Sequence, residues 1–87
     1  MGNQLNKPEK VLIKMHFEKE EKIIQWLNKL LEKDKSIINE PINLTKDTIL
    51  HFAAYHRKFK IVDFLIENGA DKDIKNTFGI SPLDLAL

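Results

Sequence analysis

Residues 43–50 read NLTKDTIL, and residues 76–83, 33 positions later, read NTFGISPL. The matching pairs along this spacing are Asn43 with Asn76, Thr48 with Ser81, Leu50 with Leu83, Phe52 with Leu85, and Ala53 with Ala86. A fixed period of about 20 to 50 residues is typical of proteins built from stacked repeats. Such units build an extended surface, and they rarely carry out chemistry.

The residues around the two stretches carry the signals of helix ends. Thr48 and Ser81 are good N-cap residues, because a short hydroxyl can accept a hydrogen bond from an unpaired backbone N–H. Pro82 then falls at the first helical position, where its missing N–H costs nothing. Gly69 follows an apolar run at helical spacing, where a left-handed residue can end a helix. That run consists of Ile61, Val62, Phe64, Leu65 and Ile66.

From Thr48 onward the chain resembles the ankyrin repeat, a family whose period is 33 residues. The matching residues are Thr48-Ile49-Leu50-His51 at the family's Thr-Pro-Leu-His, the small pair Ala53-Ala54, the turn Gly69-Ala70-Asp71, and Gly79-Ile80-Ser81-Pro82-Leu83 at the next opening. The resemblance covers roughly half of the chain strongly and a further third weakly. It implies an all-α fold, a stack of helix-turn-helix repeats with short hairpin-like finger turns, about two and a half repeats long.

Several positions depart from the family pattern. Arg57 stands where a glycine is usual, and Lys58 where a histidine often follows it. If Arg57 adopts a left-handed conformation, the cost is roughly 1–2 kcal/mol; the loop could instead take another conformation. Lys46 also replaces a glycine whose equivalent, Gly79, is kept, so the turn at Lys46 is open as well.

Residues 8–42 are predicted to form a divergent N-terminal capping repeat. A shift of 38 positions aligns Ile23-Ile24 with Ile61-Val62. Helices are expected from Pro8 to about His16 and from Glu18 to about Lys33. The alternative is an unrelated helical hairpin packed on the repeats. The expected organisation is a flexible N-terminus (1–7), the cap (8–42), a complete repeat (43–75) and the start of a further, truncated repeat (76–87).

Composition indicates a small intracellular domain, and we expect a cytoplasmic location. The 87 residues include no cysteine, which excludes a disulfide framework and thiolate metal sites. The net charge of +1, with both signs interspersed, gives little attraction to nucleic acid or to anionic membranes. No signal peptide or spanning segment is visible. The start Met1-Gly2-Asn3 resembles an N-myristoylation signal, but Asn6 stands where that signal needs Ser or Thr.

The candidates for chemistry are few. His51 occupies the family's histidine position, where the resemblance implies a ring that hydrogen-bonds backbone and locks loops together. No paired base or nucleophile accompanies it, so a structural role is expected. Glu18, Glu20 and Glu21 near His16 are better explained as a solvated helix face than as a metal site. We therefore predict no enzyme activity, no cofactor and no metal.

The predicted function is recognition of a protein partner through the finger tips and the exposed face of the first helices, as the resemblance implies. Carried over by position, the partner-binding residues are Leu44, Thr45, Asp47, Tyr55, His56, Thr77, Phe78 and Ile80. Tyrosine is enriched at binding hot spots, which supports Tyr55. For Phe78 and Ile80, packing against the adjacent finger is the alternative.

A second hypothesis is structural. The stretch Ser81 to Leu87 opens a repeat without the second helix that should cover it, so the chain could be a fragment or spacer of a longer array. It would then associate, or self-associate, through Leu83, Leu85 and Leu87. Nucleic-acid binding ranks last, because Arg57, Lys58 and Lys60 form only a small basic patch.

Overall fold

The computed structural model describes residues 19–86. In this range the chain forms no strand. It forms α2 (Glu20–Lys33), the 3-10 helix η2 (Lys35–Asn39), α3 (Ile49–Tyr55), α4 (Phe59–Glu67) and α5 (Pro82–Ala86). The predicted all-α class is confirmed. The helix expected from Glu18 to about Lys33 corresponds to α2, whereas the helix expected from Pro8 to about His16 lies outside the described residues.

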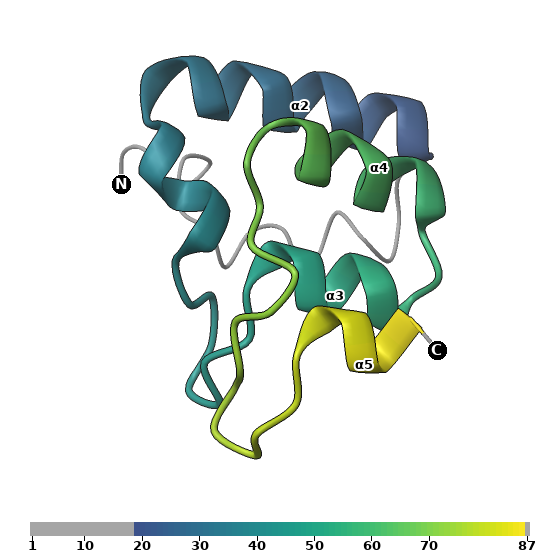
Figure 1. Ribbon diagram of the computed structural model, residues 1–87. Helices are drawn as coiled ribbons and strands as arrows, with labels where there is room; N and C mark the ends of the chain where they lie inside the picture. Colours follow the sequence, from purple (N-terminus) through teal and green to yellow (C-terminus); the bar gives the residue numbers. More distant parts are fainter. Residues whose placement is uncertain (1–18, 87) are drawn as a thin grey trace.

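The helices form two layers (Figure 1). α2 and α4 lie side by side in one layer, α3 and α5 lie side by side in the other, and the two members of each pair run in the same direction. The segments 40–48 and 68–81 project together from the end where α3 and α5 begin. A projecting turn followed by a first helix therefore occurs twice, as residues 40–48 with α3 and as residues 68–81 with α5.

Both first helices begin with reciprocal caps, as the sequence predicted for Thr48 and Ser81. In α3 the backbone N–H of His51 donates to Thr48 Oγ1 at 3.4 Å, while the Thr48 N–H donates to His51 Nδ1 at 2.9 Å. In α5 the Asp84 N–H donates to Ser81 Oγ at 3.2 Å, and the Ser81 N–H donates to Asp84 Oδ2 at 3.0 Å. Each cap satisfies two backbone donors that the helix cannot satisfy itself.

The helices α3 and α4 end in the same way, although only one of them ends in glycine. After α4, Gly69 has φ 98°, and the N–H groups of Gly69 and Ala70 donate to Ile66 and Leu65. After α3, Arg57 has φ 56° and makes the equivalent bonds together with Lys58. This is the Schellman pattern of helix ends. Arg57 therefore does adopt the left-handed conformation, and the end of α3 matches the end of α4 although it has no glycine.

Helix α4 is held at both ends by residues of α2 and η2. Its own N-cap residue, Lys58, gives no side-chain cap, and Glu20 Oε2 of α2 accepts from the Lys60 N–H at 3.0 Å instead. After the other end, Asn39 donates from Nδ2 to the Gly69 carbonyl at 3.2 Å and accepts from the Asp71 N–H at 2.8 Å. A carboxylate near a helix N-terminus also interacts favourably with the helix dipole.

The apolar core lies between the layers and includes side chains from every helical segment except α5. Fully burying one such side chain contributes roughly 1.5–3 kcal/mol. Its buried members are Ile23, Leu27, Leu30, Leu31, Ile37, Ile38, Ile42, Ile49, Leu50, Ala53, Ile61 and Leu65. Because α2 supplies four of them, it is an integral part of the core. None of the helices within residues 19–86 is long and apolar enough to cross a membrane.

Candidate protein-binding surface

The first projecting turn, finger 1 (residues 43–47), is built around an asparagine. Asn43 Oδ1 accepts from the Asp47 N–H at 2.9 Å and lies 3.0 Å from Thr45 Oγ1, and the Asn43 carbonyl accepts from the Lys46 N–H. Lys46 takes the left-handed conformation at φ 64°. The turn that the sequence left open therefore has the conformation expected of a glycine there.

The second projecting turn, finger 2 (residues 76–80), is built in the same way. Asn76 Oδ1 accepts from the N–H groups of Phe78 and Ile80 at 2.9 and 3.0 Å, and the Asn76 carbonyl accepts from the Gly79 N–H. Gly79 has φ 75°. Asparagine side chains stabilise turns by such bonds to nearby backbone.

The two fingers are joined to each other. The Thr77 N–H donates to the Thr45 carbonyl at 2.8 Å, and Asn76 Nδ2 donates to Asp47 Oδ1 at 2.8 Å. Asp47 Oδ2 also accepts from Asn43 and Thr45, at 3.0 and 2.9 Å. The carboxylate of Asp47 thus links the bases of both fingers and fixes their spacing.

His51 fastens finger 2 to α3. A backbone N–H can only donate, so the bond from the Thr48 N–H leaves Nδ1 as the acceptor and places the ring proton on Nε2. Nε2 then donates to the Ile80 carbonyl at 2.9 Å. The ring is 1% exposed. These contacts agree with the role expected for His51, a ring that locks loops together.

The predicted partner-binding residues divide into exposed and half-buried groups. Leu44 at the tip of finger 1 is 99% exposed, Phe78 at the tip of finger 2 is 70% exposed, and Tyr55 on α3 is 66% exposed. Thr77 is exposed too. Half-buried are Thr45, Asp47, His56 and Ile80. Thr45 and Asp47 join the two fingers through hydrogen bonds, and the Ile80 carbonyl ties finger 2 to His51. The side chains of Leu44 and Phe78 are exposed at the finger tips.

A pocket of about 220 Å³ opens between the fingers and the first helices. This groove pocket is lined by Asp47, Phe52, Tyr55, Asn76 and Leu85. The rings of Phe52 and Tyr55 each meet the ring of His56 edge-on, with centroids 5.6 and 5.1 Å apart. Partial burial raises the pKa of the Asp47 carboxyl, but the hydrogen bonds from Asn43, Asn76 and Thr45 outweigh it and hold that pKa below its usual value.

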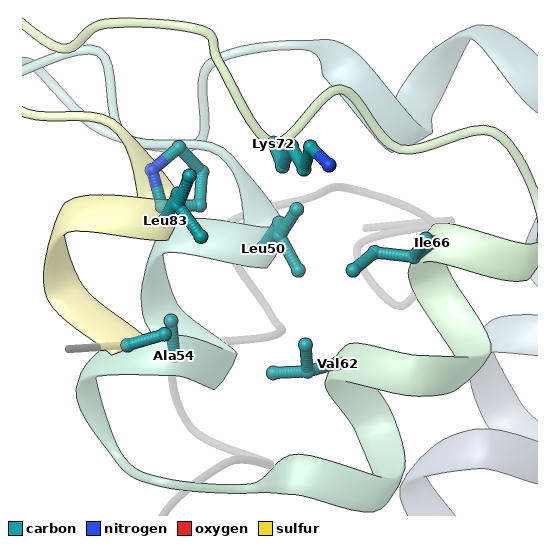
Figure 2. Close-up of a pocket in the computed structure, with 8 residues that line it drawn as sticks. Leu50, Ala54, Val62, Ile66, Lys72 and Leu83 are labelled. Atoms are coloured by element: carbon teal, nitrogen blue, oxygen red, sulfur yellow. The ribbon is translucent and has the colours of Figure 1, made fainter.

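A second, apolar pocket lies at the open end of the stack (Figure 2). This end pocket, of about 50 Å³, lies among side chains of α3, α4 and α5, with Lys72 at its edge. Its apolar lining consists of Leu50, Ala54, Val62, Ile66, Pro82, Leu83 and Ala86. Leu83 lines this pocket, but Leu85 lines the groove pocket, because residues two apart on a helix face different directions. Leu87 lies outside the described residues.

A family model described as ankyrin repeats (many copies) matches residues 38–86. The chain belongs to the ankyrin repeat family. The chain is similar to α-latrotoxin-Lt1a of Latrodectus tredecimguttatus, with 40% identity over 57 residues, and to α-latrotoxin-Lh1a of Latrodectus hasselti, with 37% identity over 49 residues. These matches cover 64% and 56% of this chain and 4% of each relative. No solved structure matches.

Ankyrin repeats are in general modules for protein–protein interaction. The fingers and α3 of this chain present exposed apolar and aromatic side chains next to polar ones. The described residues contain no group of three His, Cys, Asp or Glu side chains that could hold a metal ion.

The sequence did not predict the hydrogen bonds that join the two fingers, because Asp47 and Asn76, like Thr45 and Thr77, are about 30 residues apart. The one available signal was the recurrence of Asn43 at Asn76, which marks equivalent turns.

Proposed function

We propose that this chain recognises a protein partner through the tips of its two fingers and the exposed face of α3. The observation that carries the proposal is that Leu44 and Phe78 are exposed at 99% and 70% on turns that are themselves fixed by hydrogen bonds. Neither side chain contributes to the core. A rigid backbone that presents apolar side chains to solvent loses little conformational entropy when it binds.

The composition of this surface supports the proposal. Tyr55 and Phe78 are aromatic, and aromatic residues are enriched at interface cores and hot spots. Around them lie polar groups suited to a rim. The full proposed set is Leu44, Thr45, Asp47, Tyr55, His56, Thr77, Phe78 and Ile80. The proposal assigns the chain no catalytic activity, no nucleic-acid ligand and no membrane, and its cytoplasmic location remains a prediction.

The test uses the whole chain with a photo-crosslinking amino acid at Thr77, the exposed position next to Phe78. A control carries the same group at Gln25, an exposed position of α2 outside the proposed surface. Irradiation in an extract of the source organism should give a discrete adduct from Thr77 that the Gln25 control lacks. Adducts of equal yield from both positions would contradict the proposal.

The double variant Tyr55→Ala with Phe78→Ala then sharpens the result. Because both side chains are exposed, the variant should keep the wild-type melting temperature and circular dichroism spectrum while the Thr77 adduct disappears. The control is Phe59→Ala, which removes another partly exposed aromatic ring, at 48% exposure, from the start of α4. An adduct that survives in the double variant would place the binding surface elsewhere.

The end pocket supports a second candidate function, as a cap or spacer in a longer repeat array. We propose that its occupant is the second helix of a further repeat, which would stand to α4 as α4 stands to α2. Val62, Ile66 and Leu83 would then be covered, and Ile66 and Leu83 are each 45% exposed here. In this array residues 8–42 would act as the terminal cap, residues 43–75 as a complete repeat, and residues 76–87 as the start of the next.

Sedimentation equilibrium of the 87-residue chain, with and without a covalently appended ankyrin repeat after Leu87, tests this candidate. The extended chain should be monomeric, and thermal denaturation should show that it melts at a higher temperature than the 87-residue chain. Leu83→Lys in the extended chain should remove this increase in melting temperature. An unchanged melting temperature would count against a further repeat as the occupant. Concentration-dependent dimerisation that only the unextended chain shows would indicate self-association through the same pocket.

A further inference from the structure

The groove pocket combines one unpaired negative charge with two aromatic walls. Asp47 comes from finger 1, Asn76 from finger 2, Phe52 and Tyr55 from α3, and Leu85 from α5. No lysine or arginine lines it. The three apolar side chains form the sides, and the carboxylate and the amide supply the polar groups.

The charge of Asp47 is held by neutral partners. Its oxygens accept hydrogen bonds from Asn43, Thr45 and Asn76, and among the described residues no lysine or arginine forms an ion pair with it. An ionised carboxylate offers about four acceptor positions, of which three are in use. Acceptor capacity and negative charge therefore both remain for a ligand.

The aromatic walls favour a cation in front of that carboxylate. The ring faces of tyrosine and phenylalanine attract cations, most often guanidinium groups. Contacts with His56 orient both rings, since Phe52 and Tyr55 each lie edge-on to it. A planar guanidinium can stack on such a ring and still donate hydrogen bonds at its edge, which a lysine ammonium cannot do in the same way.

We propose that the groove pocket binds an arginine side chain presented by the protein partner, with its guanidinium donating to Asp47 and stacking on Tyr55. The methylene part of that side chain would lie against Phe52 and Leu85. This inference rests on the proposed function, because it names the chemistry that the partner brings to that surface. It commits to a positively charged recognition segment, whereas the finger tips alone would accept any apolar partner.

The direct probe is a short capped peptide, acetyl-Gly-Ser-Arg-Ser-Gly-amide, titrated into the ¹⁵N-labelled 87-residue chain. Its control replaces arginine by citrulline, which has nearly the same shape and no charge. The arginine peptide should give saturable shifts at the amides of the five pocket residues, with an affinity at least about tenfold above that of citrulline. Equal shifts with both peptides, shifts elsewhere, or no saturation up to about 10 mM would each overturn the proposal.

Three variants separate the pocket from the fold. Asp47→Asn should abolish the preference for arginine over citrulline. Because Asp47 also joins the fingers, Tyr55→Leu provides a second variant at an exposed position, and it should weaken the arginine peptide several-fold while the melting temperature stays unchanged. Glu67→Gln removes an exposed carboxylate at the end of α4, outside the pocket, and should bind as the wild type does. If Glu67→Gln lost as much of the preference for the arginine peptide as Asp47→Asn, the preference would come from the net charge of the chain and not from the pocket.

The outcome is independent of the crosslinking test. If the peptides are not discriminated but the Thr77 adduct forms and depends on Tyr55 and Phe78, the arginine inference is wrong and the recognition function stands. If the adduct is absent while the arginine peptide binds, the pocket has a ligand and the proposed finger-tip interface is wrong.

Discussion

Finger 1 and finger 2 share one backbone but differ in the side chains at their tips. Each begins with an asparagine that accepts hydrogen bonds inside the turn, and each has a left-handed fourth residue, Lys46 at φ 64° and Gly79 at φ 75°. Their second and third residues are Leu44-Thr45 in one and Thr77-Phe78 in the other. The apolar side chain has moved by one position while the turn has kept its shape.

This difference separates the residues that fix the turn from those that can vary. The asparagine and the left-handed residue determine the conformation, so the tip residues are free to change with the partner. The left-handed residue need not be glycine, because the hydrogen bonds around Asn43 hold Lys46 in a conformation that costs a lysine about 1–2 kcal/mol. A glycine at position 46 would therefore keep the same turn and make finger 1 more stable.

The largest difference should appear at His51 and Asp84, which occupy equivalent positions in the two units. His51→Ala leaves the buried Thr48 N–H without its acceptor and removes one of the two hydrogen bonds to the Ile80 carbonyl, which keeps its bond from the Asn76 N–H. It should lower the free energy of unfolding by about 2–3 kcal/mol. Asp84→Ala removes only an exposed cap and should cost about 0.5–1 kcal/mol. Urea denaturation of the two variants measures both values. Similar losses would mean that His51 acts only as a cap and that its bond to finger 2 contributes nothing.

Exchanging the left-handed residues tests the comparison of the fingers directly. Gly79→Lys should destabilise the chain by about 1–2 kcal/mol, and Lys46→Gly should stabilise it by about 1 kcal/mol. A Cβ at Gly79 would meet nothing within 4 Å, so its cost comes from the backbone alone. The control Lys46→Ala removes the same side chain and keeps the strain, so thermal denaturation should find it close to wild type. A gain in Lys46→Ala as large as in Lys46→Gly would contradict the strain argument.

The start of α4 differs from the starts of α3 and α5, because its cap comes from a different helix, α2. Glu20→Ala should lower the free energy of unfolding by about 1 kcal/mol, since it exposes the Lys60 N–H of α4. Glu20→Gln keeps an acceptor and should recover most of the loss in the same chemical denaturation series. Glu21→Ala, which removes the exposed ion pair with Lys60, should cost less. Equal losses for the two alanine variants would argue against the cap.

The smallest effect should be the pH dependence of the link between the fingers. The pKa of Asp47 is lower in the folded chain than in the unfolded chain, so its contribution is complete above the unfolded pKa of about 4 and is lost as the pH falls through the folded pKa. Asp47→Asn should therefore be less stable than wild type at pH 7, by roughly a few tenths of a kcal/mol because the group is partly exposed. At pH 3 the difference measured by urea denaturation should shrink. If the stability difference between Asp47→Asn and wild type were the same at pH 3 and pH 7, it would come from packing and not from the charge of Asp47.

The sequence predicted those parts of the fold that depend on neighbouring residues. Thr48, Ser81 and Pro82 signalled the starts of α3 and α5, and Gly69 signalled the end of α4, because caps involve residues three or four positions apart. The family resemblance supplied the role of His51. The left-handed conformation of Arg57 and Lys46 could not be decided from the sequence, because it depends on hydrogen bonds that only the folded turn provides.

What the sequence could not predict are contacts between distant segments. The η2 helix fell in a stretch without periodicity, and its Asn39 contacts Asp71, 32 residues later. The cap from Glu20 to Lys60 spans 40 residues. Similarly, the leucines after Ser81 were treated as one surface, but Leu83 and Leu85 line different pockets because α5 turns between them.

The clamping of α4 by Glu20 at one end and by Asn39 beyond the other has a consequence for how the molecule opens. While α2 and η2 are detached, the Lys60 N–H lacks its acceptor on Glu20, and the Gly69 carbonyl and the Asp71 N–H lack their partner Asn39. Partial unfolding that releases α2 and η2 should therefore release the amides of Lys60 and Asp71 in the same event. Native-state hydrogen exchange should then show one cooperative unit spanning residues 20–71. Amides on the two sides of the repeat boundary seen in the sequence should open with the same free energy.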